Sequence, residues 1–208
     1  FVMAKARTSN DGYDNGDWIV WHKDLGSSEY LILNENYAKR TESSGYDLIA
    51  TATSGTQHQV VVNNGTDGSS YNYHYLNSGP DAGTGEDYIL YGWAGVEGYS
   101  KFGKYTGNGS ADGPFIYTGF RPAFILIKNI GASQDWFIID NKREGYNPVD
   151  KFLETNSQNA EATASTNKAD FTANGFKLRG SGSVTNQSNT SFVYACFSES
   201  PLKHANAR

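Results

Sequence analysis

The run Tyr71-Asn72-Tyr73-His74-Tyr75 places an aromatic residue at every second position. In a β-strand this spacing puts the three tyrosines on one face and the two polar residues on the other. Aromatic rings with hydroxyl tips can stack on sugar rings while polar neighbours such as His74 form hydrogen bonds. We therefore consider Tyr71, Tyr73, Tyr75 and His74 as candidate glycan-binding residues. Packing against a core or a neighbouring subunit is the commoner use of such a row.

Residues 10–17 form a loop that carries three aspartates, Asp11, Asp14 and Asp17. Calcium binds several carboxylate and amide oxygens from alternate positions of one loop, so these aspartates are candidate calcium ligands. The helical calcium-loop pattern is not matched, because Tyr13 occupies an expected ligand position and no glutamate follows at the right distance. Aspartates in turns mostly hydrogen-bond their own backbone, so a plain turn is the alternative.

Motifs for other chemistry are missing from the sequence. The four histidines and the single cysteine have no metal-ligand spacing, and no nucleophile elbow, phosphate loop or dinucleotide fingerprint occurs. We therefore predict that the protein is not an enzyme, with no catalytic residues and no cofactor apart from the calcium considered above. A polysaccharide-degrading enzyme stays an alternative, because two glycosidase carboxylates need only meet in space.

Composition favours a β-rich protein that does not bind nucleic acid. Of the 208 residues 14% are aromatic, and 23 are glycine, which suits strands joined by tight turns. The formal net charge is −5, and the one basic cluster is at residues 203–208, so no phosphate-binding patch is expected. No apolar segment is long enough to span a membrane, so no membrane insertion is expected. Cys196 lies in an apolar run and is expected to fill a core.

Four sequence elements recur in the same order, which predicts two homologous units. The first unit would cover residues 1–98 and lack its N-terminal strand, and the second would cover residues 99–208, with residues 101–105 as its opening strand. The matched pairs are 1–5 with 124–128, 17–21 with 135–139, 30–34 with 151–156, and 88–94 with 192–198.

The expected fold is all-β, with two β-sandwich units that are jelly-roll-like and contain very little helix. Short strands are separated by polar turns, and few stretches have the 3.6-residue period of a helix. The segment Asn147-Pro148-Val149-Asp150 reads as a helix start, so a helical turn is predicted from there to Phe152. A similar turn is predicted over residues 35–40.

Four motifs are distinctive: KFGKYTGNGS at 101–110, GFRPAF at 119–124, NGFKLR at 174–179 and HANAR at 204–208. Together they resemble a family of tandem β domains found in structural proteins of tailed phages that infect marine bacteria, notably cyanobacteria. The similarity spans nearly all of the second unit and the framework strands of the first. It implies a virion component, such as a tail fibre or another host-contacting appendage, and it implies no catalytic residues.

The resemblance predicts a phage structural protein that binds host-surface glycan or neighbouring virion subunits. It would be assembled in the host cytoplasm and exposed to the outside on the virion. Homo-oligomers with cyclic symmetry are common in such appendages, and a trimer is the usual fibre arrangement. A non-adhesive spacer or decoration protein is the alternative to an adhesin.

Overall fold

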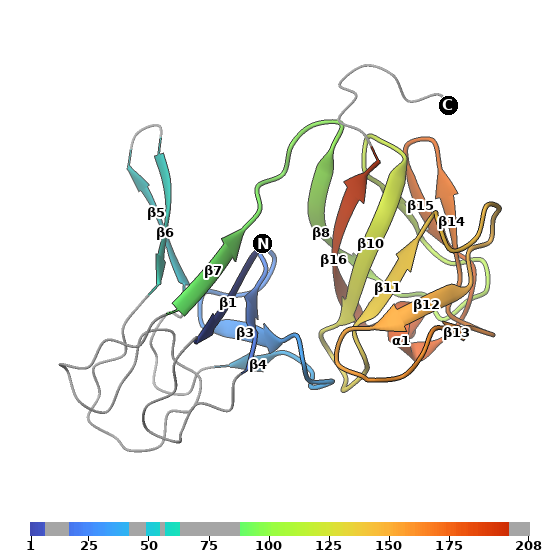
Figure 1. Cartoon of the computed structure of the whole chain (residues 1–208), viewed down its shortest axis with the longest axis horizontal. Helices are drawn as coiled ribbons and strands as arrows, with labels where there is room; N and C mark the ends of the chain where they lie inside the picture. The colour runs from blue at the N-terminus through green and yellow to red at the C-terminus, as the bar shows by residue number, and fades with distance from the viewer. Residues whose placement is uncertain (7–16, 42–48, 55–56, 63–87, 200–208) are drawn as a thin grey trace. The chain divides into compact units, whose positions relative to one another are not determined.

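The computed structural model describes residues 1–6, 17–41, 49–54, 57–62 and 88–199 (Figure 1). Contacts between Cα atoms divide the chain into two units. Unit 1 comprises residues 1–33 and 39–93, and unit 2 comprises residues 34–38 and 94–208. The second unit therefore begins at Ala94 and includes a short segment from the N-terminal half, whereas the sequence predicted units of 1–98 and 99–208.

Unit 1 contains a five-stranded antiparallel sheet in the order β4-β3-β2-β1-β7, and a separate hairpin of β5 and β6. Alternate residues of three sheet strands form an apolar cluster of Val2, Ala4, Ile19, Tyr30 and Ile32, as expected for a pleated sheet with a buried face. The strands are β1 (Val2–Ala6), β2 (Ile19–Trp21), β3 (Glu29–Ile32), β4 (Arg40–Thr41), β5 (Ile49–Ser54), β6 (Gln57–Val62) and β7 (Tyr88–Gly92).

Unit 2 contains a six-stranded sheet in the order β13-β12-β11-β10-β16-β8 (Figure 1). The two longest strands, β10 and β16, are paired at its centre, and they are the most apolar runs of this half of the sequence. The strands are β8 (Ser100–Thr106), β10 (Pro122–Asn129), β11 (Phe137–Asp140), β12 (Lys151–Glu154), β13 (Ala162–Thr163) and β16 (Ser191–Ser198). The predicted opening strand of the second unit is confirmed as β8.

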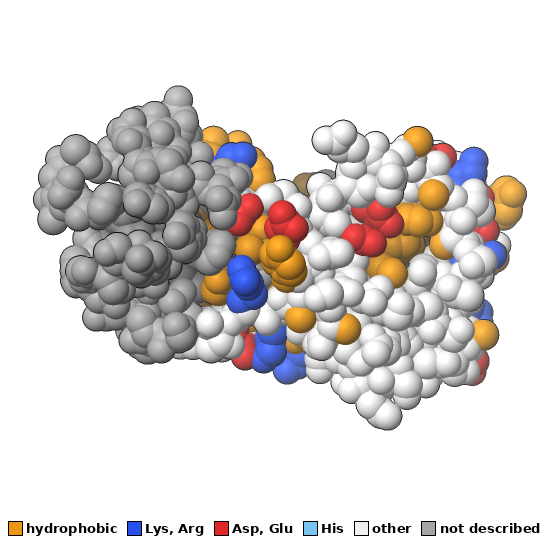
Figure 2. Space-filling model, turned by 90° about the horizontal axis from the view of Figure 1, so that it is seen from below, with side chains coloured by type: hydrophobic (Ala, Val, Ile, Leu, Met, Phe, Trp, Pro, Cys, Tyr) orange, Lys and Arg blue, Asp and Glu red, His pale blue; other side chains and the backbone are white. Residues whose placement is uncertain are grey.

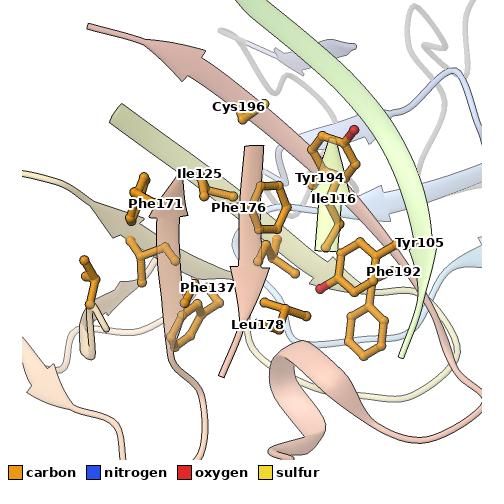
Figure 3. Close-up of a cluster of buried hydrophobic side chains, with 14 of the residues drawn as sticks. Tyr105, Ile116, Ile125, Phe137, Phe171, Phe176, Leu178, Phe192, Tyr194 and Cys196 are labelled. Atoms are coloured by element: carbon orange, nitrogen blue, oxygen red, sulfur yellow. The ribbon is translucent and has the colours of Figure 1, made fainter. Parts of the chain in front are cut away.

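A second sheet of unit 2 has the order β14-β15-β9, formed by β14 (Ala169–Thr172), β15 (Gly175–Leu178) and β9 (Phe115–Tyr117). Its inward side chains pack on those of the six-stranded sheet, so unit 2 is a β-sandwich. Figure 3 shows Phe176 lying among aromatic side chains of the larger sheet, and its ring meets that of Tyr194 edge-on at 5.5 Å between centroids. Cys196 is fully buried in the same core, as predicted.

The two larger sheets have corresponding strand orders and registers. In the alignment of the predicted repeats, Val2 corresponds to Ile125 and Gly92 to Cys196. In the sheets, Val2 pairs with Gly92 and Ile125 pairs with Cys196. The order β4-β3-β2-β1-β7 in unit 1 thus matches β13-β12-β11-β10-β16 in unit 2. This agreement supports the repeat, and descent of both units from one ancestor stays a prediction.

The helical turn predicted from Asn147 to Phe152 is wrong. The Asn147 side chain does not cap a helix: its Nδ2 donates to Phe171 O at 3.0 Å, and its Oδ1 accepts from Phe171 N–H at 2.9 Å. Val149 then forms a β-bridge with Ala169, and strand β12 follows at once. Pairing with β14 therefore outweighs the local preference of this segment for a helix start.

The prediction of an all-β fold with very little helix is confirmed. The described part of the chain contains one α-helix, α1 (Ser183–Asn186), and no helix over residues 35–40, where β4 begins at Arg40 instead. Unit 2 differs in detail from a jelly roll. Its two sheets contain six and three strands, whereas a jelly roll has eight strands in total, arranged as two Greek keys.

Candidate functional site

The outer face of the three-stranded sheet in unit 2 exposes two aromatic rings. Side chains of β9 alternate, so that Ile116 is buried in the core while Phe115 and Tyr117 are 48% and 60% exposed. Lys177 of β15 is paired with Phe115, and Asp170 of β14 is paired with Lys177, so both point to the same side. These outward residues, Phe115, Tyr117, Lys177 and Asp170, are called the β9 face.

The Phe115 ring lies against the backbone of Gly175. A Cβ built on Gly175 would be 3.0 Å from Phe115 Cζ and 2.1 Å from Ile116 O, so a larger residue there would displace the strand. Gly175 is also the cross-strand partner of Tyr117. The missing side chain of Gly175, opposite Tyr117, therefore makes room for the tip of the Phe115 ring.

Charged side chains border the β9 face in alternating sign. Lys177 Nζ is 2.9 Å from Asp112 Oδ1, and Arg179 forms an ion pair with Asp170 through its Nε. The hydrogen bond from Lys177, together with its positive charge, lowers the pKa of the Asp112 carboxyl below its usual value. These groups supply both donors and acceptors around the rings, which is the combination that orients a polar ring-shaped ligand.

Lys101 of β8 closes the outer edge of β9. Between β9 and β15, Leu178 N–H donates to Pro114 O and Thr118 N–H donates to Asn174 O. Hydrogen-bonded pairs alternate with non-hydrogen-bonded pairs along an antiparallel ladder, so the N–H and C=O groups of Tyr117 point away from β15. Lys101 Nζ donates to Tyr117 O at 2.8 Å and lies 5.2 Å from the centroid of the Tyr117 ring. A lysine at this position opposes the addition of a further strand to this edge.

The loop that leads into β9 is fixed by Asn186, at the end of α1. Its Nδ2 donates to Asn108 Oδ1, Ser110 O and Gly180 O at 2.9, 2.9 and 2.8 Å, and its Oδ1 accepts from Asn108 N–H at 2.9 Å. The glycine-rich turn over residues 107–109 thus directs its backbone N–H groups to its own chain, as expected for a turn rather than a phosphate-binding loop.

Most of the residues singled out in the sequence lie outside the described part of the structure. Tyr71, Tyr73, His74 and Tyr75 are among them, as are Asp11 and Asp14. Asp17 is described and stands two residues before β2. The described residues contain no group of three or more His, Cys, Asp or Glu side chains that could hold a metal ion. The glycan-binding and calcium predictions for those positions stay predictions.

A second aromatic surface lies on the sheet of unit 1. The Tyr91 ring of β7 stacks near Trp93 with centroids 6.0 Å apart, and it lies 5.9 Å from the ring of Trp18. Trp93 in turn lies 5.5 Å from Phe1, and Lys5 Nζ is 5.5 Å from the Trp18 ring. Tyr91 is 41% exposed, so part of this row is open to a partner.

Lys128 is a basic residue with an unusual setting in unit 2. Its side chain is fully buried and its Nζ donates to Gln134 O at 2.5 Å and to Asn36 O at 3.2 Å. Burial lowers its pKa to about 8, although the negative charge of Asp135 acts in the opposite direction. Both acceptors are backbone oxygens and the amine has no exposed surface, so its role is to hold chain segments together.

Neighbouring carboxylates on the β11 side of unit 2 are held in ion pairs. Arg143 lies between Asp140 and Glu161, with N···O distances of 2.7 and 2.5 Å. Lys168 likewise pairs with Asp150 at 3.1 Å. On the face shown in Figure 2, Lys and Arg side chains of the described residues occur in small separate groups with Asp and Glu among them, not in one basic patch.

No described helix has the length and apolar character needed to cross a bilayer.

Comparison with known proteins places the chain in a family. A family model described as a domain of unknown function, DUF7483, matches residues 1–201. The chain belongs to the DUF7483 family. The matched region includes described strands of both units, so a single family model spans both of them. No curated protein and no solved structure matches the chain significantly.

Sequence reasoning passed over Phe115 and Tyr117. The signal available was the alternation Phe115-Ile116-Tyr117 between the turn at Gly113-Pro114 and residues 118–119. All three residues are apolar or aromatic, so the pattern predicts a strand without indicating which side is exposed. Only the packing of the two sheets decides that Ile116 faces inward.

Proposed function

We propose that the chain is a virion structural protein, part of a tail fibre or host-attachment appendage, and that its β9 face binds host-surface glycan. The observation that carries the proposal is the pair of exposed rings, Phe115 and Tyr117, beside charged side chains on a sheet whose other face is fully packed. The resemblance of its motifs to phage structural proteins supplies the biological setting.

A rigid sheet suits this role because its side chains are positioned before the ligand arrives. The inner neighbours of the rings, Ile116 and Phe176, are 6% and 0% exposed, so the face has little freedom to rearrange. Aromatic side chains provide contact area at a low cost in conformational entropy, and the charged rim supplies hydrogen bonds. Binding at such a face requires no chemical step.

Glycan fits the β9 face better than strand addition from a neighbouring subunit. Strand addition requires unpaired N–H and C=O groups along the edge of β9. Lys101 covers that edge through its hydrogen bond to Tyr117 O. The Phe115 and Tyr117 side chains project from the face of the sheet, not from its edge, so they stay accessible to a ligand that lies on the face.

The test is binding of the labelled chain to a panel of marine bacterial strains, with soluble surface polysaccharide as the competitor. The double variant Phe115→Ala, Tyr117→Ala should lose at least about tenfold in apparent affinity, because both stacking surfaces are removed. Tyr146→Ala is the matched control, since Tyr146 is 75% exposed and lies on a loop between β11 and β12. Circular dichroism of each variant establishes that it is folded.

Saturable binding that the polysaccharide abolishes, and that the double variant loses while Tyr146→Ala retains it, would support the proposal. Equal binding by all three proteins would exclude the β9 face. Absence of binding to every strain would favour the second candidate, a non-adhesive spacer or decoration protein. The row formed by Trp18, Tyr91 and Trp93 favours that candidate, because Trp and Tyr are enriched at subunit interfaces.

A further inference from the structure

We infer that the glycan bound at the β9 face is an acidic one, with a sugar carboxylate that contacts Lys101. The inference rests on the proposed function and specifies the class of saccharide that the face selects. Its basis is the pairing of the basic side chains around the two rings: Lys177 and Arg179 pair with carboxylates, whereas Lys101 binds a backbone oxygen.

The cations on the far side of the rings already have anionic partners. Lys177 is paired with Asp112, and Arg179 with Asp170. A neutral sugar hydroxyl can bind to such pairs, but an anion that approached them would also meet the carboxylates. This part of the rim therefore provides little net attraction for a negative charge.

Lys101 is different, because no described carboxylate lies within ion-pair distance of it. Its Nζ donates to a neutral backbone oxygen, Tyr117 O, at 2.8 Å. An ammonium group has three N–H donors, so two remain for a ligand. Lys101 thus places a positive charge without a described carboxylate partner beside the β9 face, in a chain whose formal net charge is −5.

The position of Lys101 determines where the acidic group of the ligand would lie. Its Nζ is 5.2 Å from the centroid of the Tyr117 ring. The amine lies over the ring, so a sugar that stacks on the remaining exposed part of Tyr117 has its ring substituents near the amine. A charge-assisted hydrogen bond from Lys101 to a carboxylate substituent would fix the orientation of that sugar.

An acidic peptide is a weaker candidate for the same face. An extended peptide would gain most of its affinity by pairing with the backbone of β9, and Lys101 occupies that edge. The exposed rings of Phe115 and Tyr117 are themselves flat apolar surfaces, which suit the face of a sugar ring. The combination of flat aromatic surface and single cation therefore favours a carboxylated saccharide.

The experiment compares one polysaccharide with and without its carboxylates. Surface polysaccharide is taken from a strain that the intact chain binds, and a portion is treated with carbodiimide and borohydride so that its carboxyl groups become alcohols. Wild-type protein should bind the native polymer about 3- to 10-fold more tightly than the reduced one. Lys101→Gln should lose this preference, while Lys101→Arg should keep most of it.

Lys104→Gln is the matched control, because Lys104 is an exposed lysine of the same strand and its removal changes the net charge equally. It should retain the wild-type preference, which separates local contact from a general charge effect. A preference that survives in Lys101→Gln, or that Lys104→Gln loses equally, would overturn the inference.

The inference and the proposed function can fail separately. If native and reduced polymer bind equally tightly and the Phe115→Ala, Tyr117→Ala variant binds neither, the face binds glycan but does not select acid. If that double variant keeps full affinity for the native polymer, the site lies elsewhere and both proposals are wrong. If no surface polysaccharide binds the wild-type chain, both are likewise overturned.

Discussion

Asn186 is the residue on which the entrance to the β9 face depends. It is fully buried, and its side chain bonds to residues 108, 110 and 180. We predict that Asn186→Ala lowers the free energy of unfolding by about 2–4 kcal/mol, because several buried backbone and amide groups lose their partners together. Urea denaturation followed by circular dichroism measures the change.

Asn159→Ala is the control for this prediction, because the amide of Asn159 forms an exposed hydrogen bond with Glu154. That variant should stay within about 0.5 kcal/mol of the wild type. If Asn186→Ala were equally mild, the hydrogen bonds of Asn186 would not stabilise the loop. Nothing local in the sequence distinguishes Asn186 from other asparagines, since the partner Asn108 lies 78 positions away.

At the level of elements, apolar strands were predictable and the choice of exposed faces was not. Strands β8, β10 and β16 follow from aromatic and β-branched runs between polar turns, which is a local signal. The segment 147–152 has the local signal of a helix start, yet it pairs with β14 through contacts that no local pattern contains. The same limit applies to Phe115 and Tyr117, whose exposure is decided by how the two sheets pack.

Strand β16 contains a reporter of its own opening. It is paired with β10 on one side and β8 on the other, and Cys196 near its end is fully buried. Burial raises the pKa of the Cys196 thiol to about 12, so very little reactive thiolate exists near neutral pH. We predict that Ellman's reagent labels the native protein hardly at all and that labelling rises with urea as unit 2 unfolds. Rapid labelling without denaturant would contradict the packing of β16.

The same pKa predicts how stability depends on pH. Because the folded-state pKa lies above the ordinary value of 9.0, the unfolded chain loses this proton first as pH rises. The contribution of Cys196 to stability is therefore complete below about pH 9 and is lost as pH rises toward 12. Between pH 8 and 10 the wild type should lose about 1 kcal/mol more stability than Cys196→Ala. Equal losses in the two proteins would show that the thiol titrates normally in the fold.

For the whole molecule, the matching registers of the two larger sheets suggest two units of equal stability. The described apolar cores of the two units nevertheless differ in size. The buried apolar cluster of unit 2 includes aromatic side chains from both of its sheets, whereas the cluster described in unit 1 comprises five residues. Hydrophobic stabilisation increases with the apolar area removed from water. We therefore predict that unit 1 unfolds at a lower urea concentration than unit 2.

One variant can follow both units, because the four tryptophans are divided between them. Trp18, Trp21 and Trp93 belong to unit 1 and Trp136 to unit 2, so in Trp136→Phe the tryptophan fluorescence reports on unit 1 and Cys196 labelling reports on unit 2. The substitution replaces a buried Trp136 ring with a smaller one and so destabilises unit 2, which works against the expectation that unit 1 unfolds first. A fluorescence transition at lower urea than the labelling transition would therefore establish that the units unfold separately. Coincident transitions would mean that the DUF7483 domain unfolds as a single cooperative body, in which the smaller described core of unit 1 is stabilised by the rest of the chain.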